Sequence, residues 1–130
     1  MKQIVKIAEK IMKELKACTG WDLVGGVKGN NCSIRADVTN ESGKKIRVLL
    51  DIVATDVHIQ AVGLEGDFDE KSAELAHERL EFPVETQLEK ADIFTISYHE
   101  PLGVLEHSVK GVLNECIMPM VRLLDEMIEG

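Results

Sequence analysis

The spacing of hydrophobic and polar residues changes along the chain, and each change predicts a different element. Residues 1–18 carry apolar side chains at helical spacing and charged side chains on the other side, which predicts an amphipathic helix. Over residues 32–39 the period becomes two, the pattern of a strand with one polar face. The sequence Asn-Glu-Ser-Gly at residues 40–43 predicts a hairpin turn, because Asn and Gly tolerate positive φ angles.

The run after this turn, residues 46–54, is apolar on both faces. It predicts a central strand that is covered on both sides, at least in part. A tight turn at residues 55–56 leads into a third strand over residues 57–61, and such short turns predict antiparallel neighbours in sequence order. The Gly- and Asn-rich connection over residues 23–31 leaves open whether it holds one further short strand.

The second half of the chain predicts a helix, a hairpin and a long final helix. Asp69 is suited to cap a helix over residues 70–80, and residues 84–88 and 92–98 have the pattern of two paired strands. Apolar positions at helical spacing continue from residue 104 to residue 129, and Pro119 inside them predicts a kink. We therefore expect one α+β domain over residues 1–130, in the order α-β-β-β-α-β-β-α, with an antiparallel sheet of about five strands.

Composition limits the classes of partner. The 130 residues are 45% hydrophobic but only 4% aromatic, so the core must be aliphatic. A formal net charge of -8 disfavours both nucleic acid and anionic membrane surfaces as partners. The charged N-terminus lacks the apolar core of a signal peptide, and no apolar run approaches the roughly 20 residues that span a bilayer. Three cysteines without regular spacing predict free thiols, so we expect a cytoplasmic protein without nucleic-acid or membrane partners.

The residues that commonly ligate metals do not form a recognisable motif. The histidines lack the i,i+4 spacing of a helical zinc pair, although His99 and His107 flank one loop and could approach each other. The acidic residues between positions 65 and 70 resemble the start of a calcium loop but lack its following glycine and its distal glutamate. An acidic helix N-terminus is the preferred interpretation, and no metal or other cofactor is expected.

Candidate nucleophiles also lack a catalytic setting. Cys32 and Cys116 fall on apolar faces of their elements, which predicts inert core thiols. Cys18, at the end of the first helix, is the most exposed of the three cysteines by pattern, but no histidine is fixed beside it. The glycines of residues 25–29 match neither a P-loop nor a dinucleotide-binding fingerprint. We therefore expect a protein without enzymatic activity.

One stretch has more apolar surface than a single helix face needs. Residues 116–124 are apolar nearly all the way round the final helix, and a helix lying on a sheet buries only one stripe. This predicts a homodimer interface formed by Ile117, Met118, Met120, Val121 and Leu124. The alternative is a helix enclosed within one domain.

Three segments together resemble the type III secretion chaperone-like fold, which the YbjN-type proteins share. They are residues 34–64 with their Asn-Glu-Ser-Gly turn, residues 92–98 running into Glu-Pro-Leu-Gly at 100–103, and the amphipathic helix that follows. The resemblance implies a homodimer that holds a segment of another protein and has no enzymatic activity. It implies client contacts on the first helix and on the second face of the sheet, at Ile4, Ile11, Leu15, Leu49 and Val53.

Two classes of function follow from the sequence. The first is a non-enzymatic protein-binding module, chaperone-like or adaptor, acting as a homodimer. The alternative is a protein that binds a small ligand or metal, or an enzyme, with a pocket between the sheet and a helix. In that case His99, Glu100, His107 and Cys18 are the groups to suspect.

Overall fold

A computed structural model describes residues 2–39 and 43–129 of the chain. The strands are β1 Leu23–Lys28, β2 Asn31–Thr39, β3 Lys45–Val53, β4 Asp56–Gly63, β5 Glu85–Lys90 and β6 Ile93–Pro101. The helices are α1 Lys2–Thr19, α2 Glu70–Arg79, α3 Leu102–His107, α4 Val109–Val112, the π-helical turn η1 Leu113–Ile117 and α5 Met118–Glu129. The Asn-Glu-Ser-Gly turn predicted at residues 40–43 falls largely outside the described residues.

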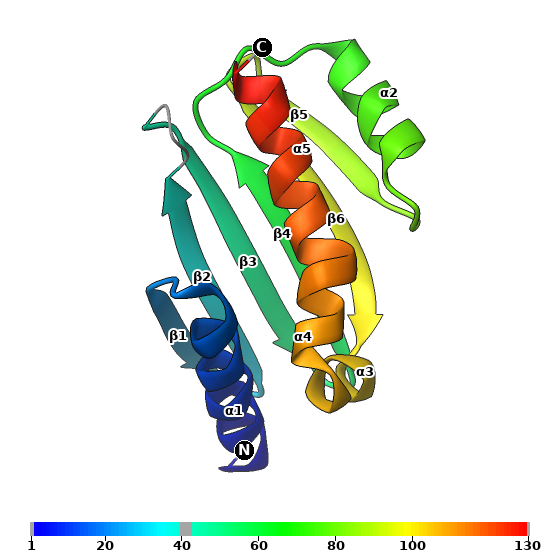
Figure 1. Cartoon of the computed structure of the whole chain (residues 1–130). Helices are drawn as coiled ribbons and strands as arrows, with labels where there is room; N and C mark the ends of the chain where they lie inside the picture. Colours follow the sequence, from blue (N-terminus) through cyan, green and yellow to red (C-terminus); the bar gives the residue numbers. More distant parts are fainter. Residues whose placement is uncertain (1, 40–42, 130) are drawn as a thin grey trace.

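The strands form one antiparallel sheet in the order β1-β2-β3-β4-β6-β5, and all the helices lie on one of its faces (Figure 1). This arrangement confirms the predicted α+β class and the antiparallel sheet. Residues 2–39 and 43–129 form six strands rather than about five, because the Gly-rich connection after α1 forms β1 at the edge. Within the described residues, no helix combines the length and the apolarity needed to cross a membrane.

Alternating side chains give the sheet two different faces. On the face under the helices, Ile34, Leu50 and Ile59 lie directly opposite one another on β2, β3 and β4, and each is at most 1% exposed. On the other face the neighbouring row is Arg35, Leu49 and Gln60. In the described residues that face carries no helix, and Arg47, Leu49 and Asp51 are half-buried there, so the second face of the 46–54 strand is covered only in part. We call this second face the open face.

The final helical region is not one continuous α-helix. It begins at Leu102, breaks at Ser108, whose hydroxyl accepts a hydrogen bond from the amide of Gly111, and widens into a π-helical turn before Pro119. Proline has no N–H, and its ring crowds the carbonyl four residues earlier, so a wider turn at this point relieves the conflict. Pro119 therefore locally widens the helix.

The apolar residues predicted to form a dimer interface are mostly buried inside the chain. Ile117, Met120 and Leu124 are completely buried, Val121 is 7% exposed and Met118 is half-buried. The helix is enclosed because α5 packs on β3 and β4 with α2 beside it, while α4 contacts α1 and α3. Burial within one chain thus accounts for the apolar stretch, and a homodimer through these residues loses its supporting observation.

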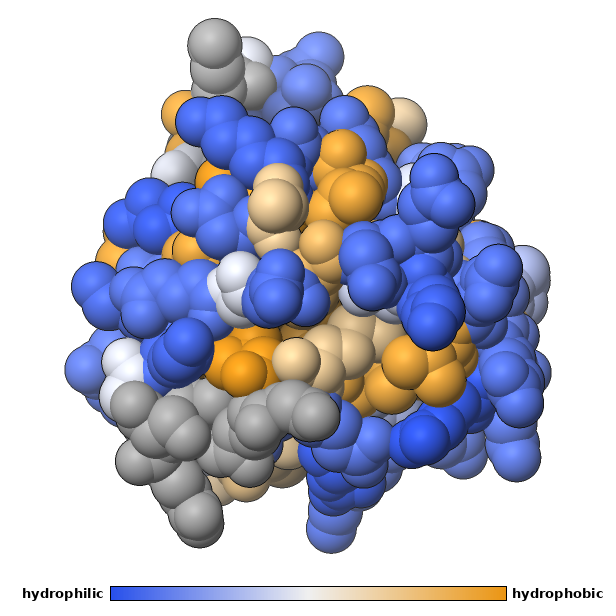
Figure 2. Space-filling view, turned by 90° about the horizontal axis from the view of Figure 1, so that it is seen from above, coloured by the Kyte–Doolittle hydropathy of each residue, from blue (hydrophilic) through white to orange (hydrophobic). Residues whose placement is uncertain are grey.

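The core between the sheet and the helices is mainly aliphatic, as the composition predicts. Seen from the end where the C-terminus lies, hydrophobic residues gather in a central band surrounded by hydrophilic ones (Figure 2). The ring of Phe68 stacks on Phe94 with centroids 5.4 Å apart and lies directly over Gly63 and Gly66. A Cβ atom added at either glycine would come within 2.6 Å of the Phe68 ring.

Replacing Gly63 by alanine is expected to destabilise the protein by about 1–3 kcal/mol, because the new methyl group overpacks the buried Phe68 ring. Chemical denaturation monitored by circular dichroism measures the change in the free energy of unfolding. Gly103→Ala is the matched control, since nothing lies within 4 Å of the position of its Cβ. Equal stability of the two variants would contradict this account of the packing.

Candidate functional site

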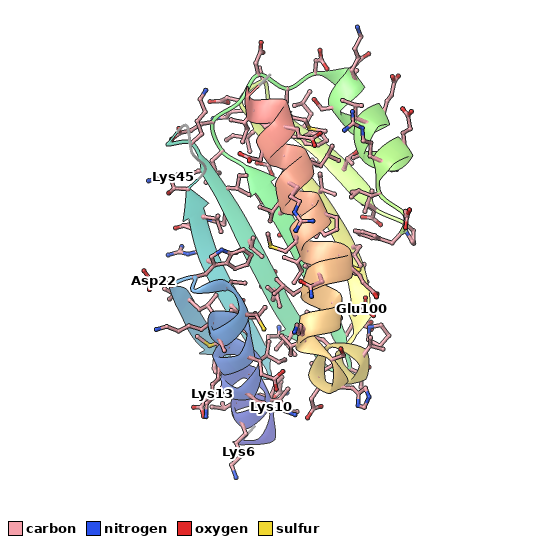
Figure 3. All side chains as sticks on the ribbon, in the orientation of Figure 1. Lys6, Lys10, Lys13, Asp22, Lys45 and Glu100 are labelled. Carbon is pink, nitrogen blue, oxygen red and sulfur yellow. The ribbon has the colours of Figure 1, made fainter. Side chains whose placement is uncertain are left out.

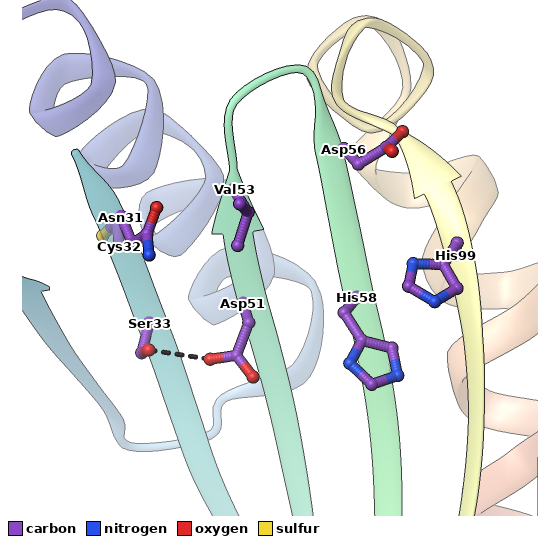
Figure 4. A pocket seen from close by; sticks show the side chains of 8 residues that line it. All are labelled: Asn31, Cys32, Ser33, Asp51, Val53, Asp56, His58 and His99. Carbon is purple, nitrogen blue, oxygen red and sulfur yellow. Dashed lines mark hydrogen bonds between the residues drawn. The ribbon is translucent and has the colours of Figure 1, made fainter.

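A row of polar side chains crosses four strands on the open face. Ser33, Asp51, His58 and His99 occupy directly opposed positions on β2, β3, β4 and β6. The Ser33 hydroxyl donates a 2.7 Å hydrogen bond to Asp51, and the rings of His58 and His99 stack with centroids 4.5 Å apart (Figure 4). These residues, together with Asn31, Cys32, Val53 and Asp56, line an open cleft of about 500 Å³.

This row does not form a Ser–His catalytic arrangement. Such an arrangement needs the imidazole within hydrogen-bond reach of the serine hydroxyl, so that it can take the proton. Here the carboxylate of Asp51 accepts from the Ser33 hydroxyl, and His58 lies on the far side of Asp51. In residues 2–39 and 43–129, no three or more His, Cys, Asp and Glu side chains group in a way that would hold a metal ion.

Sequence reasoning identified His99 together with His107, and it did not identify His58. His107 ends α3, whereas the imidazole of His99 stacks on that of His58 from β4. His58 was missed because β4 and β6 are separated by α2 and β5, so their register cannot be read from local spacing. The prediction for Asp69 is confirmed, because it caps α2 with a complete capping box.

A second candidate region lies at the β1 edge, where α1 covers β1 and β2 (Figure 1). Between α1 and β1 runs a groove of about 250 Å³, and its walls are Val5, Ala8, Glu9 and Met12 of α1, Gly25, Gly26 and Val27 of β1, and Cys32. Met12 lies over Gly25, where an added Cβ would come within 2.8 Å of the methionine sulfur. The glycine thus lets the helix approach the edge strand closely.

The two edges of the sheet differ in how well they are protected. Strand β5 has the sequence Glu-Thr-Gln-Leu-Glu-Lys and a register shift between Leu88 and Lys90, and charges and bulges both discourage further strand pairing. Strand β1 has regular pairing with β2, two central glycines, and the exposed side chains of Val24 (59%) and Val27 (51%). We call the outer side of β1, together with its groove against α1, the β1 edge.

The residues predicted to contact a client lie in two separate places. Ile11 and Leu15 lie on the inner side of α1 and are 0% and 1% exposed. Ile4, also on α1, is half-buried. Leu49 and Val53 lie on the open face, and Val53 is 48% exposed. The structure therefore does not bring these five residues together on one surface.

Burial raises the pKa of several groups on β6 and on the final helical region. Burial raises the pKa of the Cys116 thiol and of the Tyr98 phenol, and it raises the pKa of the Glu100 carboxyl. Burial also raises the pKa of the Cys32 thiol. A thiol with a raised pKa is a poor nucleophile at neutral pH, which agrees with the prediction of inert thiols at both positions.

Comparison with known proteins identifies no relative of this chain: no protein-family model, no curated protein and no solved structure matches it. The resemblance to the secretion chaperone-like fold therefore stays a prediction.

We expect a maleimide at neutral pH to modify one thiol much faster than the other two. Cys18 is exposed, whereas Cys32 is buried and Cys116 is partly buried with a raised pKa. Mass spectrometry of the intact protein over time counts the modified thiols, and Cys18→Ser should remove the fast phase. A fast phase that survives in this variant would show that Cys32 or Cys116 is reactive.

Proposed function

We propose that this chain is a non-enzymatic protein-binding module, of the chaperone or adaptor kind, that accepts an extended strand of another polypeptide chain at its β1 edge. The observation that carries the proposal is the difference between the two edges. Natural sheets protect their edges with charges, bulges or covering elements, as β5 does here. Within the described residues, β1 pairs regularly with β2 and carries one charged residue, Lys28 at its end, whereas β5 carries three charged residues and a register shift.

The chemistry of this edge determines what it can bind. An edge strand presents a row of backbone N–H and C=O groups on its outer side, and an added β-strand satisfies them in regular order. Side chains of the added strand point alternately to the two faces of the sheet. One set would enter the groove between α1 and β1, where Met12 and Val27 offer apolar contacts. Backbone pairing would supply affinity, and the groove would supply selectivity.

Other properties of the chain support this class of function. The order of elements, apart from the additional β1 and the divided final helical region, is the order predicted from the sequence in which the chaperone-like resemblance was found. All three cysteines are free, which supports a reducing compartment such as the cytoplasm.

A labelled peptide with the sequence of residues 21–30 is a suitable strand probe, because it carries the natural β1 pattern. Fluorescence anisotropy should show that the peptide binds the wild-type protein, and amide hydrogen exchange should show protection of β1 on binding. The variant Val24→Lys/Val27→Lys is expected to weaken binding about tenfold, because Val27 loses an apolar cross-strand contact and both faces of the edge gain a charge.

Leu88→Lys provides the matched control, since Leu88 is an exposed apolar residue (42%) on the opposite edge. It should leave binding unchanged. The proposal fails if the peptide does not bind, or if all the variants bind it equally well.

A further inference from the structure

We infer that the strand received at the β1 edge comes from a second copy of this chain, so that two β1 strands pair antiparallel about a twofold axis and join two sheets into one. This inference rests on the proposed function, because it names the partner of the same edge. Three features of the edge support it: the sequence of β1, the position of α1 and the order of charges along α1.

The sequence of β1 fits an antiparallel copy of itself. Directly opposed residues of an antiparallel pair share one face of the sheet, so a twofold axis at Gly25 would place Leu23 opposite Val27 of the other copy. Both residues belong to the helix-side face, because they pair with Ala36 and Cys32 of β2. On the open face, the exposed Val24 would lie opposite Gly26 of the other copy, a large side chain against a position with none.

The position of α1 suits the same arrangement. Helix α1 packs on β1 and β2 alike, so its axis runs near the line between these strands (Figure 1). Neighbouring strands are about 4.8 Å apart, which places the axes of the two α1 helices about 10 Å from each other. Packed helices are separated by about 8–10 Å, so the groove walls of the two copies would meet in direct contact.

The charges along this side of α1 are self-complementary. Met12 lies over Gly25 and therefore next to the twofold axis. Glu9 precedes Met12 by three residues, and Lys16 follows Met12 by four. Both therefore lie on the side of α1 that lines the groove with Val5 and Met12. Antiparallel α1 helices would therefore bring Glu9 of each copy opposite Lys16 of the other. The mismatch is one residue, about 1.5 Å, which long side chains span easily.

Both charged groups are available for this contact. Glu9 and Lys16 are exposed, and in residues 2–39 and 43–129 neither takes part in an ion pair within the chain. The lysines labelled in Figure 3, Lys6, Lys10 and Lys13, also extend from the exposed part of α1. Lys10 lies on the same side as Ile7 and Glu14, which do not line the groove, so it provides a control position with the same charge.

Exchange of the two charges tests the inference. Sedimentation equilibrium and native mass spectrometry should show a dimer of the wild-type protein at high micromolar concentration. Glu9→Lys and Lys16→Glu should each raise the dissociation constant about tenfold, because each places like charges opposite each other twice. The double variant Glu9→Lys/Lys16→Glu restores opposite charges in reversed order and should return the dissociation constant to within about threefold of wild type.

Lys10→Glu should leave the dimer unchanged, and Val24→Lys/Val27→Lys should dissociate it. A wild-type protein that stays monomeric but binds the strand peptide would overturn this inference and leave the proposed function standing. A dimer that the charge exchange does not rescue would place the contact elsewhere and also overturn the inference. A monomer that does not bind the peptide would overturn both proposals.

Discussion

One-sided burial is the constraint on which the rest of this structure depends. Apolar side chains occupy every second position of β2, β3 and β4 on the face under the helices, while polar and charged residues occupy most positions between them. Burying an aliphatic side chain contributes about 1.5–3 kcal/mol, so all the helices gather on this face and none covers the other. The final helical region must then be enclosed among the sheet, α1 and α2, and this enclosure explains why its surface is apolar nearly all round.

The parts of the fold that the sequence predicts are those that local patterns control. The alternation in β2 to β4, the short turns and the cap at Asp69 each depend on residues close together in the chain. Strand β1 remained ambiguous because Gly25 and Gly26 interrupt the apolar-polar alternation at its centre. The apolar residues Leu49 and Val53 predict that the central strand is at least partly covered on both faces, but in the described residues the helices cover one face only, so Leu49 is half-buried and Val53 is exposed.

The same distinction applies to the candidate sites. Neither the stacked His58 and His99 nor the groove between α1 and β1 follows from local spacing, because each joins elements whose relative placement is set by the whole sheet. The apolar stretch at 116–124 predicts an interface because a helix on a sheet ordinarily buries one stripe. Three neighbouring elements cover this helix instead, and no sequence period reports the number of neighbours.

The bulge and charges of β5 have a consequence for the size of any assembly this protein can form. A sheet with two permissive edges can add units without limit, as fibres do. Here β5 ends the sheet with charges and a register shift, and β1 ends it with regular pairing. If β1 pairs with a second copy as we propose, both outer ends of the joined sheet are β5 strands. Growth would then terminate after a single addition, and the same sheet that permits a dimer would prevent a polymer.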